Sequence, residues 1–493
     1  MFNDSTDAAF IFYILAMLFV GWRGYRATND LSDYILGGRK LSSLVTALSA
    51  GASDMSGWLL MGLPGAVFLA GISGAWIAIG LIVGAWFNWR FVASRLRLYT
   101  ERMGNALTLP DYLSKRFYDR HHVLRITSTV TILIFFTIYC ASGVVAGARL
   151  FESLFGLSYG VALWVGALTT IAYVFMGGFL AISWTDTIQA SLIVIALVLV
   201  PLAVIYDSGG VTTSIDMIKK IDITHVSLMG HLNTIGVISL LGWGLGYCGQ
   251  PHILARFMAS RSIKKIKKSR RIAITWMTLC LMGAVAVGFF GSGYYAMHPD
   301  QAVLVNANPE KVFMEIVKQL FHPALAGVLL AAILAAIMSA LSCQLLVCSS
   351  ALTSDIYKTF LRKKAPEREL VWCGRLMVLL IAVIAIFLAR DPNSYVLTMV
   401  SYAWAGFGAA FGPVIVLSLL WSRMTRAGAL AGMVTGALTV LVWKQYAWFQ
   451  LYEIVPGFIF ATIAIVLGSF ASRKPAKSVK EAFDEVHQEF KYL

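Results

Sequence analysis

Apolar runs of about twenty residues, separated by short polar segments, cover most of the chain. A run of this length is sufficient to cross a bilayer core of about 30 Å as a helix. The pattern predicts an all-α polytopic membrane protein with about 13 transmembrane helices. The predicted spans are 8–25, 41–70, 74–95, 124–154, 160–180, 188–207, 233–255, 272–297, 313–352, 370–389, 395–421, 427–446 and 449–471.

The second span is interrupted by small and polar residues, because Leu48–Gly57 contains three serines, two glycines and Asp54. An ionised carboxylate at membrane depth costs roughly 2.5 kcal/mol or more, so Asp54 needs a cation, a hydrogen-bond network or water. Irregular backbone is tolerated at that depth only where protein buries it or a cavity wets it, and its carbonyls can then coordinate a cation. We expect an ion and substrate site at this break.

The seventh span is interrupted in a similar way, since Ser239–Pro251 contains four glycines and ends in a proline. Glycines weaken helix continuity and allow close packing. The two broken spans begin successive blocks of five, and an odd block inverts its partner. This is the plan in which interrupted helices of two inverted repeats meet at the bilayer midplane.

This plan divides the chain into five parts. They are 1–40, an N-terminal helix and cytoplasmic loop; 41–210, inverted repeat one; 211–421, inverted repeat two; 422–471, two further helices; and 472–493, a cytoplasmic tail. In the tail, Val479, Phe483, Val486 and Phe490 recur at helical spacing and predict a short amphipathic helix. That helix lies either on the membrane or against the cytoplasmic loops.

Basic residues collect in every second loop, and eight lysines and arginines lie between Arg256 and Arg271. The chain has a net charge of +15, but it is 58% hydrophobic and only 13% charged. We therefore interpret the excess of lysine and arginine as a signal of membrane topology rather than of nucleic-acid binding. The bias predicts an N-terminus outside and a cytoplasmic C-terminus. The loop after the fifth span departs from it, because it carries Asp186 and no basic residue.

Other function classes lack their signatures. The six cysteines have no metal-ligand spacing and are interpreted as core residues, and the histidines are scattered. The sequence contains no repeated filter loop of a channel and no H-E-x-x-H metalloprotease motif. We therefore favour a secondary carrier over a channel or an intramembrane enzyme, with no cofactor.

Several long motifs, in order along the chain, resemble the solute:sodium symporter family and its proline-transporting branch, from about residue 7 to about residue 471. The motifs are 33–39, 46–65, 105–113, 137–143, 177–186, 242–247, 249–257 and 342–350. The resemblance implies a LeuT-like fold of 5+5 inverted repeats with an extra N-terminal helix and two additional C-terminal helices. It also implies sodium-driven import of L-proline by alternating access across a bacterial cytoplasmic (inner) membrane, with no obligate protein partner.

The resemblance places sodium, the only metal ion implied, between the second and ninth spans. The matching positions are Ala52, Met55, Asp54, Ala336, Ser339 and Ala340. Ala340 departs from the family, which has threonine or serine there. A hard cation prefers several oxygen ligands, so Ser342, Asp54 or a water must compensate, or sodium binds more weakly.

For proline, the resemblance points to Ser56, Gly57, Tyr139, Trp243 and Pro251. A zwitterion needs donors for its carboxylate, an acceptor for its ammonium, and apolar or aromatic walls. Tyr139 and Trp243 are also compatible with ordinary packing roles.

The resemblance also links Asp186, Arg39 and Arg375 to coupling or ion release. Thr185 and Asp186 immediately before an apolar run equally suit the N-cap of the sixth helix, and both arginines suit topology signals. Two rival functions stay open. One is proton-coupled proline uptake, and the other is sodium symport of another small carboxylate such as pantothenate.

Overall fold

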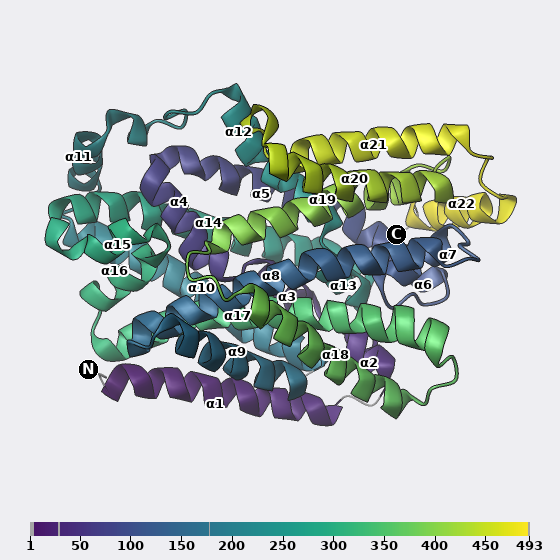
Figure 1. The fold of residues 1–493 in the computed structure, drawn as a ribbon, viewed down its shortest axis with the longest axis horizontal. Helices are drawn as coiled ribbons and strands as arrows, with labels where there is room; N and C mark the ends of the chain where they lie inside the picture. Colours follow the sequence, from purple (N-terminus) through teal and green to yellow (C-terminus); the bar gives the residue numbers. More distant parts are fainter. Residues whose placement is uncertain (1–3, 28–29, 177, 492–493) are drawn as a thin grey trace.

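The computed structural model describes residues 4–27, 30–176 and 178–491. Residues 1–3 and 28–29 of the N-terminal segment, Gly177 of the motif 177–186, and 492–493 of the tail lie outside the described residues. The described residues form helices and turns without a named strand, and one isolated β-bridge pairs Leu41 with Ser260. Long helices run side by side, while α11, α15 and α16 lie at one end and α2, α6, α7 and α22 at the other (Figure 1).

The helices fall into a long and a short group. The long ones are α1 (Asp4–Ala27), α8 (Val123–Phe155), α9 (Tyr159–Met176), α10 (Phe179–Asp207), α14 (Ile263–Met297), α17 (Pro323–Ser350), α18 (Glu367–Leu388), α19 (Val396–Leu420), α20 (Arg426–Tyr446) and α21 (Ile454–Ala471). The short ones are α2 (Leu31–Leu36), α3 (Ser43–Asp54), α4 (Leu63–Ala70), α5 (Ala75–Phe87), α6 (Ala93–Arg102), α7 (Leu109–Arg116), α11 (Val211–Ile221), α12 (Thr234–Leu241), α13 (Pro251–Ala259), α15 (Val303–Ala307), α16 (Val312–Leu320) and α22 (Lys477–Lys491).

Nine helical segments of the described chain are long and apolar enough to cross a membrane, and three shorter apolar helices accompany them. This confirms the all-helical class, while the count of thirteen spans stays a prediction. The predicted core role of the cysteines also agrees with the structure, since all are free thiols, five buried and Cys373 half-buried.

Both predicted breaks are confirmed. The α3 helix ends at Asp54, Met55 leaves helical geometry (φ −83°, ψ 78°), and a π-helical turn, η2 (Trp58–Gly62), leads into α4. In the second break, α12 continues as a 3₁₀ segment, η6 (Gly242–Gly249), before α13 starts at Pro251. The glycines of η6 permit backbone contact, because a Cβ at Gly244 would collide with the carbonyl of Gly80 on α5.

Two predicted boundaries are wrong. The run 313–352 is two helices, α16 and α17, because the chain is extended at Phe321 and Pro323 starts a new helix. The sixth span begins at Phe179 rather than near residue 188, so Asp186 lies two turns inside α10 and does not cap it. Ser183 lies in this polar turn, and its hydroxyl donates to the Phe179 carbonyl of the same helix at 2.7 Å, so the side chain is paired without leaving α10.

The predicted tail helix is present as α22, and it packs against α6. The Phe483 ring lies 6.2 Å from the Tyr99 ring, and Arg102 donates to both carboxylate oxygens of Glu489 at 2.8 and 2.9 Å. This contact with α6 agrees with one of the two placements that the sequence leaves open, the one against the protein.

Candidate ion and substrate site

Asp54 joins the two broken helices. Its side chain is buried at the last turn of α3, and its Oδ2 accepts a hydrogen bond from the Tyr247 hydroxyl on η6. Its Oδ1 is buried without a hydrogen-bond partner among the described residues. The Asp54 carbonyl, freed by the break, accepts from Trp58 Nε1 at 3.1 Å and from the Tyr139 hydroxyl at 3.3 Å.

Three of the predicted sodium ligands lie together. The Ser339 hydroxyl donates to the Ala52 carbonyl at 2.8 Å and lies 3.1 Å from the Ala336 carbonyl. The oxygens of α3 and α17 thus converge at the break, as a hard cation requires. Ala340 follows on α17 and is buried, adding a methyl group but no side-chain oxygen.

The other two predicted ligands are placed differently. Met55 is buried at the break itself. Among the described residues, the carboxylate of Asp54 has no hydrogen bond to Ala52, Ala336 or Ser339. It accepts a hydrogen bond from the Tyr247 hydroxyl instead.

The predicted substrate residues divide into two groups. Ser56, Gly57 and Tyr139 lie around the first break, where the Ser56 hydroxyl is buried without a partner among the described residues. A Cβ at Gly57 would lie only 2.7 Å from that of Ala146, so this position admits no larger side chain. The second group, Trp243 and Pro251, lies on the second broken helix.

The indole of Trp243 is part of an aromatic cluster. Its ring centroid lies 6.2 Å from that of Trp58, 5.5 Å from that of Tyr452 and 6.4 Å from that of Trp404. Because Trp58 follows the first break and Trp243 lies in the second, this aromatic cluster reaches from one break to the other.

Pro251 lies elsewhere, where it lines a small cavity of about 30 Å³ between α13, α7 and α17.

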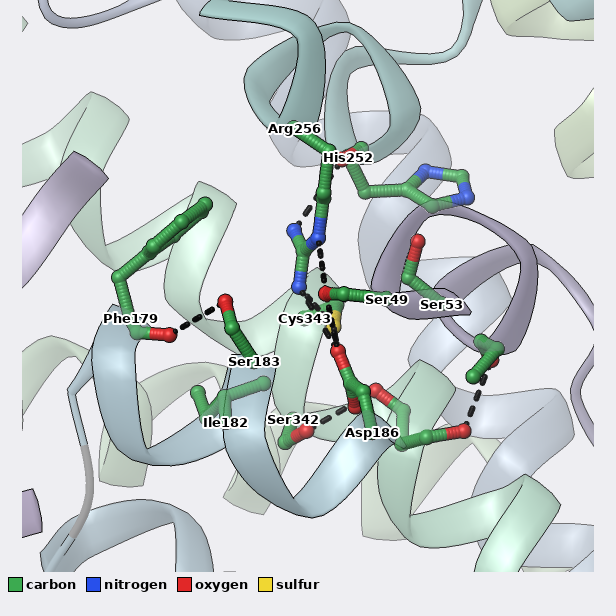
Figure 2. Close-up of polar contacts among 12 residues, drawn as sticks. Ser49, Ser53, Phe179, Ile182, Ser183, Asp186, His252, Arg256, Ser342 and Cys343 are labelled. Carbon is green, nitrogen blue, oxygen red and sulfur yellow. Dashed lines mark hydrogen bonds and ion pairs between the residues drawn. The ribbon is translucent and has the colours of Figure 1, made fainter. Parts of the chain in front are cut away.

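Asp186 lies in a separate polar network that joins four helices (Figure 2). Ser49 of α3 donates to its Oδ2 at 2.6 Å, and Arg256 of α13 approaches the same oxygen at 3.4 Å. Arg256 Nε also donates to the Ser49 hydroxyl at 3.2 Å, and Cys343 of α17 contacts both charged groups. The prediction that Arg256 is a loop topology signal is wrong, because its side chain is fully buried on α13.

Arg39 and Arg375 lie apart from Asp54. Arg39 donates to the Met258 carbonyl at 2.5 Å, to the Ala106 carbonyl at 2.8 Å and to the Asn105 side chain at 2.8 Å. Burial, followed by repulsion from Arg97, lowers the pKa of Arg39 to about 10. Arg375 is buried on α18, with its guanidinium carbon 5.2 Å from the centroid of the Trp372 ring.

Three residues of these networks escaped prediction: Tyr247, Arg256 and Ser49. For Tyr247 a signal exists, since it follows Trp243 by four residues and both belong to a glycine-rich break. For the other two, no local pattern indicates that α10 brings a carboxylate to them.

Comparison with known proteins settles the family. The sequence model of the Sodium:solute symporter family matches residues 34–436, most of the chain. The chain belongs to the Sodium:solute symporter family. Family membership and the apolar helices together make it a multi-pass membrane transporter rather than an enzyme.

Relatives within this symporter family match almost end to end. The chain is 62% identical to the sodium/proline symporter of Escherichia coli (strain K12), across 97% of this chain and 95% of that protein. It is 48% identical to the high-affinity proline transporter PutP of Bacillus subtilis (strain 168), across 95% and 98% of the two chains.

Solved structures show the fold. A Na⁺-coupled sialic acid symporter in a substrate-bound outward-open state superposes with a TM-score of 0.82 at 18% identity, covering 96% of this chain and 99% of that one. The nucleobase-cation-symport-1 transporter Mhp1, in a closed conformation, gives a TM-score of 0.56 at 11% identity over 92% and 98%. The fold is therefore the LeuT-like symporter fold.

Proposed function

We propose that this symporter imports L-proline together with sodium by alternating access. The observation that carries the proposal is the 62% identity, over nearly the full length, to a protein named as a sodium/proline symporter. The convergence of oxygens from α3 and α17 at the first break supports the sodium half of the proposal.

Sodium binds in this proposal between the Ala52, Met55 and Ala336 carbonyls and the Ser339 hydroxyl. In the structure, the Ser339 hydroxyl bonds directly to the Ala52 carbonyl, so a bound ion replaces that hydrogen bond. Asp54 supplies the negative charge near the site and orders the break through Tyr247. Among the positions that the resemblance assigns to sodium, Ala340 is the one where the family has a hydroxyl ligand and this chain has none.

Proline binds beside sodium, between the two breaks. The Ser56 hydroxyl receives its carboxylate, and Tyr139, Trp243 and Pro251 line the space for its ring. Burial of the Ser56 hydroxyl without a partner among the described residues supports this placement, because a buried polar group is costly unless a ligand or water pairs with it. Asp186, Arg39 and Arg375 take part in the release of sodium or in its coupling to proline transport.

We further propose that the protein lies in a bacterial inner membrane, with its N-terminus outside and its C-terminus in the cytoplasm. We propose that it crosses the membrane thirteen times and that its five parts end at residues 40, 210, 421, 471 and 493. The lipid bilayer, sodium and proline are its partners. The alternation of basic loops along the sequence supports this orientation.

Sodium supplies sufficient driving force. One sodium ion entering at −100 mV gains about 2.3 kcal/mol, which sustains roughly a fifty-fold substrate gradient before any sodium gradient is counted. Proton coupling is the specific rival, favoured by the missing hydroxyl at Ala340 and by the buried Asp54.

The deciding experiment uses purified protein in liposomes with radiolabelled L-proline. Uptake under an inward sodium gradient is compared with uptake under an equal proton gradient in sodium-free buffer, and protein-free liposomes are the control. We expect uptake with sodium alone. Uptake with protons alone would make Asp54 a proton carrier, and uptake of pantothenate but not of proline would replace the substrate.

A further inference from the structure

The side chain of Arg256 is completely buried, which is rare for a charged group unless it is paired. Among the described residues, Asp186 is the only carboxylate that it contacts. Its other partners are neutral: the Ser49 hydroxyl, the His252 carbonyl at 3.1 Å, the Cys343 thiol and the Phe179 ring. Arg256 and Asp186 therefore form one neutral unit inside the protein.

This ion pair is loose on the carboxylate side. The Ser49 hydroxyl lies 2.6 Å from Asp186 Oδ2, whereas the Arg256 guanidinium lies 3.4 Å from the same oxygen. Asp186 Oδ1 is buried with no hydrogen-bond partner among the described residues. A buried carboxylate that has one unpaired oxygen, and whose counter-ion contacts only the other oxygen, can accept another cation.

The neutral unit is connected to the proposed sodium ligands along one face of α17. Ser339, Ser342 and Cys343 share that face because they are spaced by three and four residues. The Ser342 hydroxyl donates to the Ser339 carbonyl at 2.9 Å, and Cys343 Sγ lies 3.7 Å from Asp186 Oδ2. In Figure 2, Ser342, Cys343 and Asp186 lie next to one another below Arg256.

We infer that Arg256 is a positioning residue that acts as a tethered counter-ion of Asp186 and competes there with sodium. While sodium is held between α3 and α17, the guanidinium neutralises Asp186. When sodium leaves along α17, it meets Asp186, and the guanidinium turns away and then returns. The returning charge displaces the ion, so Asp186 guides sodium without retaining it.

This inference rests on the proposed function and makes an unusual prediction for Arg256→Gln. Without the competing charge, Asp186 retains sodium more strongly, since an uncompensated buried carboxylate favours any available cation. We expect the sodium concentration for half-maximal proline uptake to fall about tenfold, and the maximal rate to fall as well. In Asp186→Asn/Arg256→Gln, the carboxylate is also gone, and the sodium requirement returns to or above the wild-type value.

The controls separate positioning from folding. Arg116 is another buried arginine, whose Nε donates to the Ser418 carbonyl at 3.1 Å, so Arg116→Gln removes a buried charge elsewhere. We expect it to lower the melting temperature without lowering the sodium requirement. If Arg256→Gln does not fold, Ser49→Ala tests the same point, because it removes the hydroxyl that bridges Arg256 and Asp186; we expect a two- to threefold lower sodium requirement.

An unchanged or higher sodium requirement in Arg256→Gln, or in Ser49→Ala if only that variant folds, would overturn the inference. So would a double variant that keeps the lowered value. If wild-type uptake is independent of sodium, the proposed function itself fails. If it depends on sodium and the variants show no shift, only the role of Arg256 fails.

Discussion

At the scale of single residues, the carboxylate of Asp54 is only half compensated. The Tyr247 hydroxyl serves one oxygen, and the other has no partner among the described residues, although an ionised carboxylate at this depth needs full compensation. In the proposed function, a bound sodium ion supplies the missing compensation. We therefore propose that Asp54 contributes affinity for sodium even without direct coordination.

Asp54→Asn is expected to abolish sodium-driven proline uptake, by about a hundredfold or more, because it removes the charge and keeps the shape. The asparagine can still accept from Tyr247, so the amount of protein in the membrane should stay near normal. Uptake in liposomes measures the effect. The neighbouring Ser53 donates only to the Ala50 carbonyl within its own helix, at 3.0 Å, so Ser53→Ala is the matched control and should transport normally. Normal uptake by Asp54→Asn would contradict the assignment.

Ala340 is the second residue-scale test. Ala340→Thr adds a hydroxyl beside Ser339, and one additional oxygen ligand should lower the sodium concentration for half-maximal uptake about threefold or more. Ala340→Val has a similar shape without the oxygen and is the control, expected to leave the sodium requirement unchanged or higher. If both variants behave alike, volume rather than ligation decides the response, and another group already completes the sodium shell.

At the scale of elements, α22 is held by apolar contacts more than by charge. Phe483 is 6% exposed and lies against Tyr99 and the guanidinium of Arg116, whereas the ion pair between Arg102 and Glu489 is open to water. Exposed ion pairs contribute little because solvent screens them. Burial of an aromatic ring contributes several times more.

Phe483→Ala is therefore expected to release α22, whereas Arg102→Ala leaves it docked. Replacing a well-buried phenylalanine costs about 3–5 kcal/mol in protein cores, which is sufficient to expose the tail to protease. Limited trypsin digestion of the detergent-purified protein, followed by mass analysis of the released tail, compares the two variants. Equal cleavage rates in both variants would mean that the ion pair, not the ring, anchors the helix.

Element-scale features divide into those that local sequence predicts and those that it does not. Glycine, serine and aspartate inside an apolar run are unfavourable for a lipid-facing helix, so both breaks are predictable. The interior position of Asp186 is not, because Thr185 and Asp186 before an apolar run equally suit a helix N-cap, whereas in the structure α10 already begins at Phe179. The buried role of Arg256 cannot be predicted for a different reason. Its partner, Asp186, is 70 residues away in sequence and contacts it only in the folded protein.

At the scale of the whole molecule, the order of the spans and the family are evident from the sequence, while the convergence of α3, α10, α13 and α17 on one polar core is not. Composition reports which segments are apolar but not which faces meet. Resemblance supplies the proposed sodium and proline positions, and the structure adds that the Ser339 hydroxyl contacts both the Ala52 and the Ala336 carbonyl.

Coupled transport predicts reciprocal binding across the molecule. If sodium orders the first break for proline, it raises proline affinity by the same factor by which proline raises sodium affinity. Calorimetric titration of the detergent-purified protein gives both factors, with choline replacing sodium as the reference. Equal proline affinity in sodium and in choline would exclude this scheme.

The bridge between Leu41 and Ser260 has a mechanical consequence. Leu41 donates its amide to the Ala259 carbonyl at 3.3 Å and accepts from the Arg261 amide at 3.0 Å, beside the contact of Arg39 with Met258. The segment before α3 and the end of α13 are thus hydrogen-bonded to each other, so we expect the two broken helices to stay together at this end. A disulfide between Leu41→Cys and Ser260→Cys should leave proline uptake intact, because it fixes two segments that we expect to stay in contact throughout the transport cycle.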